Sequence, residues 1–322
     1  MPEPSPTPRR RGRLFRFGAA LVVLLAVAGY LAVQYVTGGA GAPGCRVVSA
    51  DGDGTEYEFT PEQAVNAATI AAVGTGRELP ERAVTIALAT ALQESALRNI
   101  EHGDRDSLGL FQQRPSMGWG TEREIMDPTY AAGIFYDHLV KVEDYTELPL
   151  TVAAQRVQRS GFPDAYAKHE PDATLLAAAL TGRSAATLTC EGRPGTTPVT
   201  GTAPVRDALA RDFGQDVLES AGAVVGEESG PSASPEDDGD GDGRTLDLPV
   251  ASDGGKRDAA ERGWQLAHWA VANASALRIE RVSYAGREWT AGNTDSQWRA
   301  LESEGAAGAE RGTGSVRIVT AH

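Results

Sequence analysis

The chain has 322 residues and a formal net charge of −14 at pH 7, and 41% of its residues are hydrophobic. This length predicts about two domains, and the apolar content is sufficient for each of them to bury a core. Because binding to phosphate groups needs clustered Lys and Arg, the acidic balance argues against nucleic acid as a partner.

The N-terminus predicts a membrane anchor. Residues 1–16 form a basic tail, and residues 17–36 are an apolar run in which Gln34 is the strongly polar side chain. Twenty helical residues span about 30 Å, which is enough to cross a bilayer. The basic tail favours the cytoplasmic side, so we expect a single-pass protein of the cell membrane with its bulk extracytoplasmic. A cleaved signal peptide is the alternative, although Pro43 would then follow the cleavage sequence at 40–42.

Residues 37–59 are expected to be a tether that includes the start of a disulfide. The two cysteines of the chain, Cys45 and Cys190, bracket the first folded region. A disulfide persists outside the cytoplasm, and one that closes a loop of this length stabilises a fold by about 4–5 kcal/mol in the chain-entropy model. Two unrelated thiols are the other interpretation.

Residues 60–190 read as a mainly α domain. Thr60, Pro61 and Gln63 predict a capped helix start, and Pro80 begins a second helix that continues to Glu94. Further helices are expected from Pro128, over residues 152–157 and over residues 173–180.

Residues 88–114 carry the strongest functional signal. Glu94 lies near the end of an Ala/Leu-rich helical run, and the apolar turn Ser107–Gln113 (SLGLFQQ) follows a charged loop. A carboxyl group among Leu, Phe and Trp is expected to have a raised pKa, which suits general-acid chemistry on a glycosidic bond.

The combination of Gln93-Glu94-Ser95 with this turn resembles the lysozyme-like lytic transglycosylases, over roughly residues 60–186. Residues 153–170 resemble a segment of phage and actinobacterial members, although Val157–Ser160 stands where typical members have Tyr-Asn-Ala-Gly. The resemblance implies that Glu94 cleaves peptidoglycan glycan strands between N-acetylmuramic acid and N-acetylglucosamine, acting first as acid and then as base without a cofactor. The candidate substrate-binding residues are Ser95, Gln112, Gln113, Trp119, Gln158 and Tyr166. Ser95 and Gln112 match positions of the family motif, the amides of Gln112 and Gln113 suit hydrogen bonds to neutral sugars, and the Trp119 ring is of a kind that stacks on sugar rings.

The sequence leaves two alternatives to a lytic transglycosylase. Asp106 as a second carboxylate would allow a hydrolytic lysozyme on the same fold, because inverting hydrolases use a base to activate water. A catalytically silent protein that binds the cell wall is the other alternative. The five histidines do not have the spacing of a zinc site, so no metal is expected.

A linker at 191–203 precedes a C-terminal α+β module at 204–322. We expect a helix over 205–223, an acidic disordered segment at 226–254, a helix over 264–274, a hairpin over 279–289 that turns at Ala285-Gly286, and a strand over 316–320. The module resembles a small domain of actinobacterial exported proteins, similar to segments attached to cell-wall hydrolases. Only His268 and His322 could serve as metal ligands in this module. We therefore interpret it as a non-catalytic module associated with the cell wall.

Overall fold

The computed structural model describes residues 44–161, 163–192, 201–215, 217, 243–250, 258–292, 297–301 and 314–321. All of these residues belong to one compact unit that begins at Pro43. No helix within these ranges combines the length and the apolar character that crossing a bilayer requires. The anchor predicted at residues 17–36 lies outside the described residues.

The first half of this unit is mainly helical, as expected. Thr60 caps the first helix, and its side chain and that of Gln63 form the reciprocal capping box that the sequence predicts. The α-helices are α2 (Pro61–Gly76), α3 (Glu81–Ser95), α4 (Glu122–Ile125), α5 (Pro128–Leu139), α6 (Leu150–Gln158) and α7 (Glu170–Leu180). Two 3-10 helices, η2 (Pro115–Met117) and η3 (Pro163–His169), connect them.

A small antiparallel sheet and a disulfide close this region. Strand β1 (Cys45–Val48) lies between β2 (Glu56–Phe59) and β3 (Leu188–Cys190). Cys45 pairs with Cys190 in the register of the sheet, and their sulfur atoms form the predicted disulfide. The three strands are only three or four residues long, so they carry too few alternations for the sequence to indicate them.

The C-terminal module is a mixed α and β structure, as expected. Its helices are α8 (Ala203–Phe213), α10 (Ala259–Ala272) and α11 (Ala274–Leu277). Five antiparallel strands follow the order β4-β8-β5-β6-β7, namely β4 (Thr245–Pro249), β8 (Ser315–Thr320), β5 (Ile279–Tyr284), β6 (Arg287–Thr290) and β7 (Arg299–Ala300). The hairpin between β5 and β6 turns at Ala285-Gly286, where both residues have positive φ.

Two expectations for this module are wrong. The helix expected over 205–223 ends at Phe213, because Gly214 adopts a φ of 92° that an α-helix cannot include. The segment expected to be disordered, 226–254, contains strand β4. Leu246 and Leu248 alternate with exposed residues there and are buried, which gives the strand an apolar face to pack.

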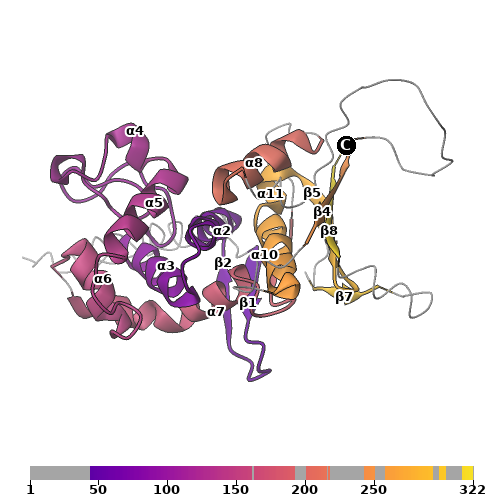
Figure 1. Ribbon diagram of the computed structural model, residues 1–322, viewed down its shortest axis with the longest axis horizontal. Helices are drawn as coiled ribbons and strands as arrows, with labels where there is room; N and C mark the ends of the chain where they lie inside the picture. The colour runs from indigo at the N-terminus through magenta and orange to yellow at the C-terminus, as the bar shows by residue number, and fades with distance from the viewer. Residues whose placement is uncertain are drawn as a thin grey trace, which may run out of the picture. The chain divides into compact units, whose positions relative to one another are not determined.

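Helix α10 joins the two halves of the unit. It packs against α2 and α7 on one side and against β5 and β8 on another (Figure 1). Gln265 of α10 donates to Thr75 of α2 at 2.6 Å. Two indoles of the module, Trp289 and Trp298, donate to the carbonyl oxygens of Cys190 and Leu188, each at 2.9 Å. The module therefore bonds directly to the strand that carries the disulfide.

Candidate active site

Glu94 occupies the last turn of α3, and the protein ends this helix abruptly. The next two residues, Ala96 and Leu97, both have left-handed backbone conformations, with φ of 53° and 57°. Such conformations cost a non-glycine residue roughly 1–2 kcal/mol each. Two side chains of α2 hold the turn, since Gln63 donates to the carbonyl of Ala96 and Asn66 to that of Leu97, at 2.8 and 2.7 Å. Helix α2 thus fixes where Glu94 sits.

The turn after the charged loop packs directly against the end of α3. Ser95 is buried and donates to the carbonyl of Leu110 at 2.8 Å. Gln113 is also buried, and it donates to the carbonyl of Ala131 at 3.0 Å. Gly109 has a φ of 74°, which gives the turn its reversal. Ser95 and Gln113 therefore act inside the protein, where they hold the turn next to Glu94.

Tyr166 and Gln158 converge on Glu94 from later elements of the chain. Tyr166, on η3, is fully buried, and its hydroxyl donates to Glu94 Oε1 at 2.7 Å. Gln158 ends α6, donates to the carbonyl of Phe111 at 2.7 Å, and also hydrogen-bonds Glu94. The structure therefore brings together three of the residues singled out in the sequence.

The surroundings of Glu94 shift its ionisation. Partial burial raises the pKa of the Glu94 carboxyl above its usual value of 4.5, while the hydrogen bonds from Tyr166 and Gln158 lower it by a smaller amount. Burial likewise raises the pKa of Tyr166, followed by the charge of Glu94 beside it. Glu94 thus keeps its proton to a higher pH than an exposed glutamate, and Tyr166 stays a hydrogen-bond donor.

Asp106 lies in the loop before the turn and bonds elsewhere. Its carboxylate accepts from Arg114 Nε at 2.7 Å and from the backbone N–H of Ser116 at 2.9 Å. The hydrogen bonds from Ser116, and then the one from Arg114, hold the pKa of Asp106 well below its usual range. These contacts fasten the loop to the segment around η2, and they leave Asp106 a weak base.

Trp119 and Gln112 lie at the surface near the turn. The Trp119 ring is half-buried and stacks on His138, with ring centroids 4.3 Å apart. Gln112 is also half-buried, has a φ of 47°, and donates to the carbonyl of Gly109 at 3.3 Å. One face of Trp119 is therefore occupied by His138, and Gln112 is held by its own turn.

A second contact next to Glu94 was not foreseen in the sequence. His169 Nε2 lies 3.2 Å from Gln93 Oε1. Residues three apart share one face of a 3-10 helix, so Tyr166 and His169 both approach α3 from η3. The three-residue spacing of Tyr166 and His169 is the sequence feature that could have indicated this contact. Helix η3 therefore contacts both Gln93 and Glu94.

His268, a candidate ligand in the sequence, is a core residue. It is fully buried, and its Nδ1 lies 2.8 Å from the carbonyl of Ala179, which requires the proton on Nδ1. His322 lies outside the described residues. Within those residues, no group of three or more His, Cys, Asp or Glu side chains is placed to hold a metal ion.

A comparison with protein families finds a match in the C-terminal module. Residues 201–311 are similar to the family described as VldE, C-terminal domain, a match that covers about a third of the 322-residue chain. The matched segment includes α8, α10 and β4 to β7 and ends before β8. No curated protein matches the chain.

Proposed function

We propose that this protein is a lytic transglycosylase, anchored in the cell membrane, that cleaves peptidoglycan glycan strands on the extracytoplasmic side. The proposal rests on Glu94, a half-buried carboxyl with a raised pKa that Tyr166 and Gln158 hold at the end of α3. The resemblance of residues 60–186 to lysozyme-like enzymes supplies the substrate class. The anchor at 17–36 and the extracytoplasmic location belong to the same proposal, and the disulfide supports an oxidising compartment.

The chemistry uses one proton carrier. Protonated Glu94 donates its proton to the glycosidic oxygen as the bond from this oxygen to the muramic acid C1 breaks. The Glu94 carboxylate then takes the proton of the sugar's own 6-hydroxyl, whose oxygen bonds to C1. The product is a 1,6-anhydro sugar, and Glu94 is left protonated for the next cycle. A raised pKa suits this residue because it must begin protonated.

The alternative is hydrolysis by a lysozyme-type mechanism with Asp106 as the base. Its lowered pKa makes Asp106 a poor proton acceptor, and its carboxylate is already bonded to Arg114 and Ser116. These contacts of Asp106 favour transglycosylation over hydrolysis.

The test is mass spectrometry of purified peptidoglycan after digestion with residues 43–322, which form one compact unit. Glu94→Gln is the inactive variant, and Glu101→Gln, at an exposed glutamate of the loop, is the matched control. Anhydro-muropeptides from the wild type and the control, with none from Glu94→Gln, are expected. Products with reducing ends would instead identify a hydrolase. Binding to peptidoglycan without any cleavage would identify a silent wall-binding protein.

A further inference from the structure

A hollow in the protein surface is lined by residues other than those that bond to Glu94. It is a cavity of about 330 Å³ between α2, the connection from α4 to α5, and α8. Its apolar lining consists of Val65, Met126 and Pro128, and its polar lining of Asn66, Thr69, Asp127, Arg123 and Arg211. This volume lies at the lower end of the range for small-molecule sites, roughly 300–1,000 Å³. It suits a ligand of the size of one sugar ring.

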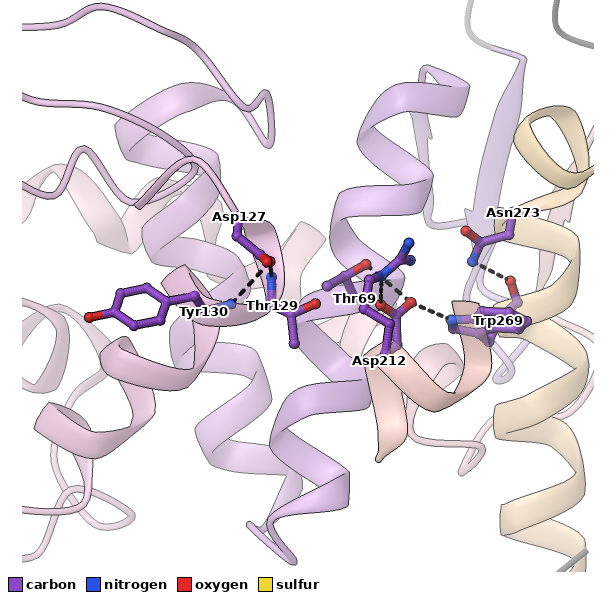
Figure 2. Close-up of polar contacts among 8 residues, drawn as sticks. Thr69, Asp127, Thr129, Tyr130, Asp212, Trp269 and Asn273 are labelled. Atoms are coloured by element: carbon purple, nitrogen blue, oxygen red, sulfur yellow. Dashed lines mark hydrogen bonds and ion pairs between the residues drawn. The ribbon is translucent and has the colours of Figure 1, made fainter. Parts of the chain in front are cut away.

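Arg211 is held in place by a buried network behind it. Its Nε donates to Asp212 Oδ1 at 2.8 Å, and the Asp212 side chain is fully buried. Asp212 Oδ2 accepts from Trp269 Nε1 of α10 at 2.8 Å and from Thr69 Oγ1 of α2 at 3.3 Å (Figure 2). A guanidinium fixed through Nε keeps its terminal N–H groups for another partner. Three helices thus combine to orient one arginine at this cavity.

The charges of the lining indicate what the cavity accepts. Arg123 and Arg211 contribute two guanidinium groups, and Asp127 contributes one carboxylate. Asp127 uses Oδ1 to cap α5 through the N–H groups of Thr129 and Tyr130 (Figure 2). Asp212 behind Arg211 adds a second carboxylate, so the two guanidinium groups are balanced in charge, and what the lining offers is N–H donors. The terminal N–H groups of a guanidinium match the planar fork of a carboxylate.

We propose that this cavity is a binding site for a carboxylate-bearing amino sugar. The carboxylate lies against Arg123 and Arg211, and the acetamido group lies against Val65, Met126 and Pro128. The carboxylate is inferred from the arginines alone, whereas the choice of an amino sugar rests on the proposed function. Tyr166 and Gln158, which bond to Glu94, do not line this cavity, so the catalytic carboxyl lies outside its lining; Asn66 belongs to the lining and also holds the turn after α3.

The test compares two sugars that differ in one group. N-acetylmuramic acid carries a lactyl carboxylate, and N-acetylglucosamine is the same ring without it. The full-length chain is titrated with each sugar while the indole N–H signals of its five tryptophans are followed by NMR. The Trp269 indole reports on the cavity through Asp212, and Trp269→Phe serves only to assign its signal. The variants are Arg123→Gln and Arg211→Gln, with Arg287→Gln at an exposed position as the control.

N-acetylmuramic acid is expected to shift the Trp269 signal in a saturable way, and N-acetylglucosamine to bind at least about tenfold more weakly, since a hydrogen-bonded charge pair contributes about that factor. Arg123→Gln and Arg211→Gln each remove this preference, and Arg287→Gln retains it. Equal binding of both sugars, or a preference that survives Arg123→Gln, overturns the proposal. Tighter binding of N-acetylglucosamine 6-phosphate overturns the assignment to a carboxylate. Glu94→Gln is expected to abolish cleavage and to leave this titration unchanged, so failure of the binding site is distinct from failure of the proposed function.

Discussion

Tyr166 donates a hydrogen bond of 2.7 Å to Glu94, although the two residues lie 72 positions apart in the chain. The bond stabilises the ionised carboxylate and partly offsets the effect of burial on the pKa of Glu94. It also fixes the orientation of the carboxyl group, because Tyr166 is fully buried and cannot follow a moving partner.

Tyr166→Phe is expected to raise the pKa of Glu94 further, because it removes the hydrogen bond that favours the charged form. The alkaline limb of the pH–rate profile for glycan cleavage should therefore move to higher pH. Loss of orientation should lower kcat/KM, by up to about a hundredfold. The profile is measured on soluble glycan, beside Tyr130→Phe, whose hydroxyl bonds to the carbonyl of Trp119. A limb that stays in place or moves to lower pH would contradict this role for Tyr166.

Glu94→Gln is expected to stabilise the protein at neutral pH. A carboxyl whose pKa is raised by folding contributes stability below the unfolded value of 4.5 and loses it as pH rises through the folded value. The uncharged amide does not carry this penalty, so the variant should gain on the order of 1 kcal/mol at pH 7.5, the usual size of a single stabilising substitution. Urea denaturation at pH 7.5 and pH 4 measures the difference, with Glu101→Gln as the exposed control. A gain that is as large at pH 4 would count against this explanation.

His268 is expected to make the fold sensitive to acid. Burial lowers the pKa of His268 from 6.5 to about 4, so the folded protein binds this proton less well than the unfolded chain. The stability is complete above pH 6.5 and declines as pH falls from there toward 4. His268→Asn keeps a donor for the carbonyl of Ala179 but does not titrate. Its unfolding free energy should therefore change less steeply over this pH range, and an unchanged slope would refute the prediction.

Gly182→Ala is expected to loosen the packing of α10 on the end of α7. Gly182 has a φ of 85°, and an added Cβ would collide with the backbone carbonyl of Glu261. Left-handed strain and overpacking together should cost at least about 2 kcal/mol. Thermal and urea denaturation measure the loss. Gly314→Ala, where a Cβ meets no neighbour within 4 Å, should have a much smaller effect. Equal losses in the two variants would argue against the collision.

Much of the local structure could be predicted from the sequence. The capping box of Thr60 and Gln63, the position of Glu94 near a helix end and the turn at Ala285-Gly286 all depend on residues within a few positions of one another. Such features follow from backbone propensity and hydrophobic periodicity, which act over one or two turns of helix. The helix that ends at Phe213 is the exception, because the positive φ of Gly214 ends it although the amphipathic pattern continues beyond this residue.

The surroundings of the functional side chains were decided by the tertiary structure. Tyr166 and Gln158 were named through a resemblance, but only the packing of η3 and α6 against α3 brings their polar atoms to Glu94. Asp212 meets Thr69 and Trp269 only because α8, α2 and α10 pack together. Each of these contacts joins residues far apart in the chain, and the partner of a buried polar group depends on the packing of whole helices. The packing of the helices depends on the contacts of all core side chains together. No short stretch of sequence is therefore sufficient to predict it.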